Sequence, residues 1–219
     1  MNPKTSLKEI DLHLNNTCYL KCRHCVFSSG ERKIKEMSFE AIKKIIKEFA
    51  EINSNGVVNL FGGEPLLRSD ILNIIKEIKK QGLSVGITTN CEMPDHLVEA
   101  VLVAGVNRMT TNLDGATAQT HDWLRNKKGN FEKAKKALGL FVSKNIFTTV
   151  NSVIYQDNIN EVEAILNICR DIGVDALAFY FMTPTGRGLG MIDKVVGPEK
   201  WLETKKVITN EKMKNGINS

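Results

Sequence analysis

Apolar positions along the chain follow two periods in turn, and this pattern predicts a regular alternation of strands and helices. Residues 7–14 alternate like a half-buried strand, and short apolar runs indicate five more strands, at 57–61, 83–89, 106–113, 147–154 and 176–181. Between the strands, apolar residues recur three and four positions apart, as on one face of a helix. Helices are expected after Ser38 and Asp70, at 94–104, around 131–141 and 162–169, and at 198–213.

This order of elements predicts an α/β fold on a parallel sheet, because each helix returns the chain across the sheet in a right-handed crossover. Six strand–helix units fall short of the eight that close a barrel. A curved, open partial barrel and a flat doubly wound sheet both fit that count. No linker or low-complexity stretch divides the chain, so a single domain over residues 1–219 is expected.

Composition and charge narrow the class of protein. The chain is 42% hydrophobic and 25% charged, which is typical of a folded domain. Its net charge is +5, but the lysines are scattered along predicted helices and do not indicate a nucleic-acid-binding patch. Residues 1–8 are polar, unlike a secretory signal, and the longest apolar stretch, 97–106, is shorter than the roughly 20 residues that span a bilayer. We therefore expect a cytoplasmic protein with neither nucleic-acid nor membrane partners.

Three cysteines, Cys18, Cys22 and Cys25, follow the first predicted strand within eight residues. Thiolates are the soft ligands that zinc and iron–sulfur clusters prefer. Structural zinc sites and ordinary iron–sulfur clusters take four protein ligands, so three cysteines leave one position open, as a catalytic site does. The alternative is a closed zinc site with His13 or His24 as the fourth ligand. Five cysteines in all indicate metal chemistry in a reducing compartment rather than a disulfide framework.

Polar and glycine-rich segments follow the other predicted strands as well. Ligands of parallel α/β folds bind at the carboxyl ends of the strands. The segments at those ends are 62–65 after the second strand, 88–90 after the third, 112–115 after the fourth, and 184–188 after the sixth. We therefore expect them to meet the cysteines on one rim, with Arg187 in a loop beside the site.

The Cys-x3-Cys-x2-Cys run, followed one strand later by Gly62-Gly63-Glu64-Pro65, resembles the radical S-adenosylmethionine (radical SAM) enzymes over about residues 7–190. The resemblance implies a (βα)6 partial TIM barrel and favours it over the flat sheet. It also implies that the three cysteines hold a [4Fe–4S] cluster whose fourth iron chelates SAM. Gly62, Gly63 and Glu64 would then meet the amino group of SAM.

The same resemblance assigns further residues to SAM. His24 would lie against the adenine, and Asn90 and Asn112 would contact the methionyl or ribose part, although related sequences often carry Ser at the place of Asn112. The run from His121 to Arg125 resembles the subgroup that modifies peptides or matures cofactors, and there Arg125 would pair with the SAM carboxylate.

The resemblance implies reductive cleavage of SAM to methionine and a 5′-deoxyadenosyl radical, which abstracts hydrogen from a peptide or cofactor-precursor substrate. A ferredoxin- or flavodoxin-like protein would supply the electron. Members of that subgroup usually continue into a cysteine-rich C-terminal domain. No such segment follows in this sequence, so it is either the core of a longer protein or a minimal member. Two alternatives stay open: a non-catalytic zinc or iron–sulfur module that recruits a partner, and a core that cleaves SAM without processing a substrate.

Overall fold

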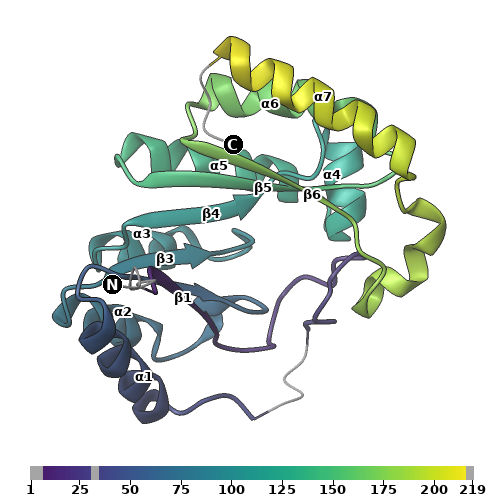
Figure 1. The fold of residues 1–219 in the computed structure, drawn as a ribbon. Coiled ribbons are helices and arrows are strands. Elements are labelled where there is room, and N and C mark those ends of the chain that lie inside the picture. The colour runs from purple at the N-terminus through teal and green to yellow at the C-terminus, as the bar shows by residue number, and fades with distance from the viewer. Residues whose placement is uncertain (1–6, 31–34, 216–219) are drawn as a thin grey trace, which may run out of the picture.

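The computed structural model describes residues 7–30 and 35–215, so most of the polar N-terminal segment lies outside the described residues. One sheet of six parallel strands has the order β1 to β6, each strand pairing with the next in sequence (Figure 1). The strands are β1 (Glu9–His13), β2 (Val57–Phe61), β3 (Ser84–Thr88), β4 (Arg108–Asn112), β5 (Phe147–Ile154) and β6 (Ala176–Phe181). This uninterrupted order and the curvature of the sheet confirm the partial barrel and exclude the flat doubly wound sheet, in which the strand order reverses.

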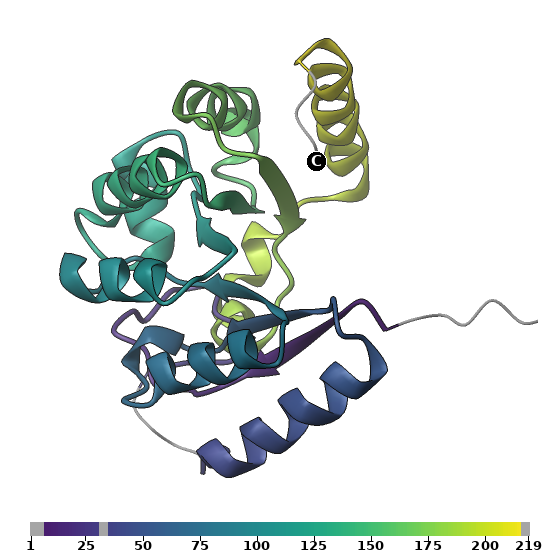
Figure 2. The same cartoon turned by 90° about the vertical axis from the view of Figure 1, so that its left-hand side faces the viewer.

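Helices cover the outer, convex side of the curved sheet (Figure 2). They are α1 (Phe39–Ile52), α2 (Ile71–Lys80), α3 (Asp95–Val103), α4 (Ala118–Arg125), α5 (Asn130–Ser143), α6 (Val162–Ile172) and α7 (Pro198–Asn215). Local sequence determines where α1 begins. The Ser38 hydroxyl accepts a hydrogen bond from the Ala41 amide, an N–H that has no partner within the helix. Within 7–30 and 35–215, none of the helices combines the length and the apolar character that crossing a membrane demands.

The two faces of the sheet differ in polarity, because successive side chains along a strand point to opposite faces. Val58 and Leu60 are buried among the helices, with Ile46 and Ile75 in the same core cluster. Asn59 lies between them on β2, and its amide donates to the Asp11 carboxylate at 2.9 Å. The core therefore fills the space between sheet and helices, and polar groups occupy the other side of the strands.

Two segments differ from the expected elements. Helix α4 was not predicted, because its eight residues carry few apolar positions, and only His121, Leu124 and Arg125 are buried. The segment around Arg187 was expected to be a loop but forms a 3-10 helix, η3 (Gly186–Lys194). Gly186 begins it with φ +54°, and a Cβ there would lie 2.5 Å from the Cys25 carbonyl oxygen. Two shorter 3-10 turns are η1 (Pro65–Leu67) and η2 (Ile159–Glu161).

Asn158 joins the carboxyl ends of β4 and β5 and gives a test of the fold. Its fully buried amide donates to the Asp114 carbonyl at 2.9 Å and the Val153 carbonyl at 2.8 Å, and accepts from the Tyr155 amide. Asn158→Ala leaves these groups buried without partners, so we expect the free energy of unfolding to fall by about 3 kcal/mol in urea denaturation. The exposed Asn55→Ala should change it by less than about 0.5 kcal/mol, and equal effects would contradict the assignment.

Candidate functional site

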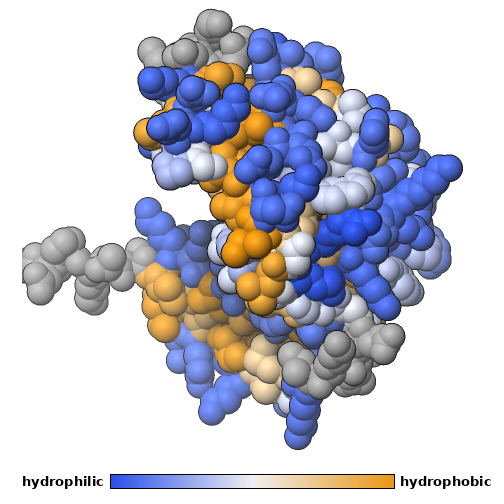
Figure 3. All heavy atoms as spheres, turned by 90° about the vertical axis from the view of Figure 1, so that its right-hand side faces the viewer, coloured by the Kyte–Doolittle hydropathy of each residue, from blue (hydrophilic) through white to orange (hydrophobic). Residues whose placement is uncertain are grey.

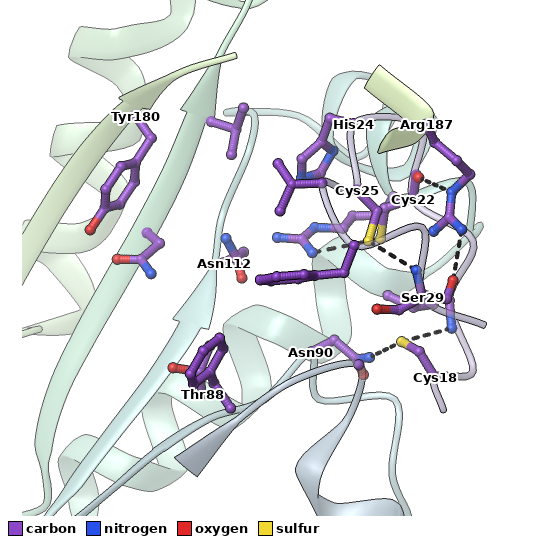
Figure 4. A pocket seen from close by; sticks show the side chains of 18 of the residues that line it. Cys18, Cys22, His24, Cys25, Ser29, Thr88, Asn90, Asn112, Tyr180 and Arg187 are labelled. Atoms are coloured by element: carbon purple, nitrogen blue, oxygen red, sulfur yellow. Dashed lines mark hydrogen bonds between the residues drawn. The ribbon is translucent and has the colours of Figure 1, made fainter. Parts of the chain in front are cut away.

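A cavity of about 500 Å³ opens at the carboxyl ends of the strands, a size suited to a small molecule (Figure 4). The cysteine loop lies on one side of it, and Asn112 and Tyr180 face that loop from the strands. The cavity-lining residues that the sequence predicted are Cys18, Cys22, His24, Cys25, Gly62, Gly63, Asn90, Asn112 and Arg125. Glu64 is the one predicted site residue that does not line it.

The three predicted metal-ligating thiols are free and follow β1 on a single loop. Backbone amides approach two of them: Leu20 N–H donates to Cys18 Sγ and Ser29 N–H to Cys25 Sγ, both at 3.4 Å. Burial raises the pKa of the Cys18 thiol to about 11. Thiols bind metal as thiolates, so a cluster bound here would displace their protons. The donor set, three soft sulfurs with N–H donors, fits an iron–sulfur cluster.

Side chains from other elements also reach the thiols. Asn90, after β3, donates to Cys18 Sγ at 3.2 Å, and Arg125 Nη1, at the end of α4, approaches Cys22 Sγ at 3.7 Å. Burial raises the pKa of the Cys22 thiol, and the Arg125 guanidinium opposes that rise. The loop is thus held in contact with the end of β3 and the end of α4, which are distant from it in sequence.

Arg125 is held by a buried ion pair. Its Nε donates to Asp114 Oδ2 at 2.6 Å, while Asp114 Oδ1 accepts from the Val153 amide at 2.8 Å. Burial alone would raise the pKa of Asp114, but Arg125, together with the two histidines and the Val153 hydrogen bond, outweighs burial, and the pKa lies below its ordinary value. Arg125 Nη2 is buried and has no hydrogen-bond partner among the described residues, which leaves a cationic donor for a ligand. Sequence reasoning did not pair Asp114 with Arg125, although Asp114 follows a predicted strand.

His121 and Asn130 extend this network without lining the cavity. His121 Nδ1 accepts from the Asp114 amide at 3.0 Å, so its Nε2 carries the proton and donates to Asn130 Oδ1 at 2.9 Å. Asn130 then donates to the Asn90 carbonyl at 3.2 Å. Burial lowers the pKa of His121, which keeps the ring neutral. These two residues therefore position Asn90 beside Cys18.

Gly62 and Gly63 allow the end of β2 to approach the cysteine loop. A Cβ on Gly62 would lie 2.5 Å from the Asn15 carbonyl oxygen, and one on Gly63 would collide with the Thr17 carbonyl oxygen. The Gly63 amide donates to the Asn15 carbonyl at 2.9 Å, so the two segments are hydrogen-bonded as well. Close packing therefore requires glycine at both positions, independently of any contact that their backbone makes with a ligand.

Glu64 is fully buried behind the cavity wall. Its carboxylate accepts from Asn90 N–H at 2.8 Å, Thr89 Oγ1 at 3.0 Å and Leu66 N–H at 3.2 Å. Burial raises the pKa of Glu64 to about 7, against the lowering effect of these hydrogen bonds. The carboxylate ties β2 to β3, and its contact with a SAM amino group stays a prediction.

The two histidines considered as metal ligands lie in different places. His24 lines the cavity, its Nδ1 has no hydrogen-bond partner among the described residues, and burial lowers its pKa to about 4. His13 instead stacks on Phe27, with ring centroids 4.6 Å apart. Within the described part of the chain, no three His, Cys, Asp or Glu side chains are grouped so that they could hold one metal ion.

Arg187 holds the cysteine loop from η3, a role that the sequence did not reveal. Its Nε donates to the Cys22 carbonyl and its Nη1 to the Ser29 carbonyl, both at 2.7 Å. Figure 4 shows the guanidinium beside the loop. The sequence places Arg187 between two glycines after a predicted strand, which indicated a position near the site. Its hydrogen-bond partners, the carbonyls of Cys22 and Ser29, are more than 150 residues away in sequence and could not be predicted.

A partial barrel with three free cysteines on the loop after its first strand is typical of an α/β enzyme that binds a cofactor at the strand ends. The chain belongs to the Radical SAM superfamily, whose pattern it matches over residues 12–204, and it is an enzyme of that type. It is 28% identical over 199 residues to the AdoMet-dependent heme synthase of Nitratidesulfovibrio vulgaris, covering 90% of this chain and 54% of that protein. It is 31% identical over 183 residues to the mycofactocin maturase MftC of Mycolicibacterium smegmatis, covering 82% of this chain and 46% of that protein.

Solved structures share the fold. Streptococcus suis SuiB bound to S-adenosylmethionine superposes with a TM-score of 0.80 at 17% identity, over 95% of this chain and 48% of that one. The anSMEcpe structure with bound AdoMet and Kp18Cys peptide gives 0.79 at 17% identity, over 96% and 62%. At this identity the likeness concerns the fold alone. The chain spans about half the length of the curated relatives named above.

The anchoring role of Arg187 can be tested in the metal-free protein. Arg187→Ala removes two charge-assisted hydrogen bonds, so local opening of the loop becomes easier. We expect amide hydrogen exchange across residues 22–29 to accelerate by about tenfold or more in a mass-spectrometric measurement. Arg108→Ala, at the opposite end of the sheet, serves as the control. Equal exchange in the two variants would show that Arg187 does not hold the loop.

Glu64 predicts a pH dependence of stability. Its folded-state pKa of about 7 exceeds the ordinary value of 4.5, so its contribution is fully present below pH 4.5 and is lost as the pH rises through 7. Relative to Glu64→Gln, which does not titrate, metal-free wild type should lose about 3 kcal/mol of unfolding free energy between pH 4.5 and 8. The exposed Glu51→Gln is the control. Parallel stability profiles for wild type and Glu64→Gln would refute the shift.

Proposed function

We propose that this chain binds a [4Fe–4S] cluster and SAM and generates a 5′-deoxyadenosyl radical that abstracts hydrogen from a peptide or cofactor-precursor substrate. One observation carries the proposal: three free thiols and an unpartnered buried guanidinium nitrogen line the same cavity. When bound, the cluster supplies the electron that cleaves the sulfur–C5′ bond of SAM. The hard chemistry belongs to the cofactors, and the protein supplies position and a dry site.

The chain's own residues would divide the work of binding. Cys18, Cys22 and Cys25 would hold the cluster and leave one iron open to SAM. The free Nη2 of Arg125 supports a contact with the SAM carboxylate, since a guanidinium pairs well with that group. The unpartnered Nδ1 of neutral His24 suits a hydrogen bond to the adenine.

Other predicted residues would complete the SAM site from the strand ends. Asn90 and Asn112 line the cavity, where their amides are suited to the methionyl and ribose parts. The cavity-lining Gly62 and Gly63 would offer backbone carbonyls to the SAM amino group, with Glu64 holding that segment in place.

Two observations support the proposed substrate class: the apolar side chains at the mouth of the cavity and the names of related proteins. A hollow bordered by apolar side chains is visible on the side of the molecule shown in Figure 3. Val26, Phe27 and Tyr180 line the cavity and are about half exposed, so they could contact a substrate. Relatives named for mycofactocin maturation and subtilosin biosynthesis, and a SuiB structure with its precursor peptide, favour a peptide. Relatives named AdoMet-dependent heme synthase favour a cofactor precursor. The electron would come from a ferredoxin- or flavodoxin-like protein.

The radical chemistry has a direct test. We reconstitute the protein anaerobically with iron and sulfide, add dithionite and SAM, and measure 5′-deoxyadenosine by mass spectrometry. Wild type should bind four irons and form the product, while Cys22→Ala should lose both, because a thiolate ligand is missing. Cys169→Ala, in the core of α6, should retain both. Zinc binding in place of iron, or four irons without product, would instead support a non-catalytic module.

A further inference from the structure

Asn90 makes a hydrogen bond with every polar group that it offers. Its N–H donates to Glu64 Oε2 at 2.8 Å, and its carbonyl accepts from Asn130 Nδ2 at 3.2 Å. Its side-chain Oδ1 accepts from the Glu92 amide at 2.9 Å, and its Nδ2 donates to Cys18 Sγ at 3.2 Å. These four contacts determine where the side chain lies, and Figure 4 shows it turned toward Cys18.

The contact with Glu92 also determines which end of the amide faces the sulfur. A backbone N–H can only donate, so the Asn90 atom beside the Glu92 amide is the acceptor oxygen, and the atom beside Cys18 is the donor nitrogen. Turning the amide over would oppose two donors at Glu92 and place an oxygen against the sulfur. Because Nδ2 carries two hydrogens, one stays available to a ligand in the cavity.

The backbone beside Asn90 has an unusual conformation. Cys91 has φ +61°, in the left-handed region that residues with a side chain seldom adopt. Its amide donates to Thr89 Oγ1 and its Sγ to Thr111 Oγ1, both at 3.2 Å. Such backbone strain persists only where surrounding contacts enforce it, and it is typical of functional sites. Tertiary contacts, rather than local preference, therefore place Asn90.

Asn130 holds Asn90 from the start of α5 and lies outside the cavity. It is buried, and its Nδ2 donates both to the Asn90 carbonyl and to Glu92 Oε1, the second at 3.0 Å. Since the Glu92 amide orients the Asn90 side chain, Asn130 supports that orientation twice. Asn130 reaches no thiol among the described residues, so any effect that it has on Cys18 passes through Asn90.

We propose that Asn90 raises the reduction potential of the cluster held at Cys18 and that Asn130 is its positioning residue, an inference that rests on the proposed function. A cluster gains one negative charge when it accepts an electron. An N–H donor directed at a ligand sulfur stabilises that added charge, and hydrogen bonds to the sulfurs are among the factors that set cluster potentials. No covalent bond forms or breaks in this step, and the external reductant loses the electron that the cluster gains.

The test is a redox titration of the anaerobically reconstituted protein without SAM, followed by electron paramagnetic resonance of the reduced cluster. Asn90→Leu nearly preserves the side-chain volume and removes the donor. At the wild-type midpoint potential, the ratio of reduced to oxidised cluster should fall about tenfold, which is a shift of about 59 mV to lower potential for one electron. Asn130→Leu should shift the potential in the same direction by less, because Asn90 keeps its amide.

Asn151→Leu is the matched control. Asn151 lines the same cavity from β5 but donates to no thiol among the described residues. Its replacement makes the same change of side chain, so the midpoint potential should stay at the wild-type value. Equal downward shifts in Asn90→Leu and Asn151→Leu would show an effect of cavity polarity and overturn the inference.

Further outcomes separate the two proposals. Zinc in wild type, or a cluster that forms no 5′-deoxyadenosine with dithionite and SAM, overturns the proposed function. Product formation by wild type together with equal midpoint potentials in wild type and Asn90→Leu overturns the inference alone. Should Asn90→Leu fail to bind four irons, Asn130→Leu must still lower the potential, or the inference fails.

Discussion

The buried ion pair between Asp114 and Arg125 is the interaction on which the arrangement of the site depends. Asp114 follows β4 and also accepts from β5, and Arg125 ends α4 and reaches Cys22 of the loop after β1. Removing one partner of such a pair leaves an uncompensated buried charge, which typically costs about 3–5 kcal/mol. The pair therefore couples the first strand's loop to the middle of the sheet, and it leaves one guanidinium nitrogen for a ligand.

Close backbone packing supplies the second constraint. Gly62 and Gly63 lie so near the loop after β1 that no side chain fits between, and Asn15 donates to the Glu64 carbonyl at 2.7 Å. Glu64 then binds the segment after β3. The ends of three neighbouring strands thus form one rigid rim, which meets the need of a catalytic site for side chains held by a supporting shell.

The loop that carries the cysteines has two chemically different sides. Its inward residues meet a cavity with a partly apolar mouth, and its outward residues meet a basic surface. A partial barrel makes this possible, because β1 and β6 are the two edge strands of the sheet, each paired on one side, and the loop lies at the opening between them (Figure 1). The same short loop therefore lines two hollows of different chemical character.

The sequence by itself determined the six strands, most of the helices and the cysteine motif, because hydrophobic period and ligand spacing are local properties that short windows contain. It missed α4, whose few apolar positions carry no clear period. Only the tertiary structure decided the partners of Arg187, Asp114 and Glu64. Those contacts join residues up to 165 positions apart, and they exist because the register and curl of the sheet bring the strand ends together. No local pattern encodes that proximity.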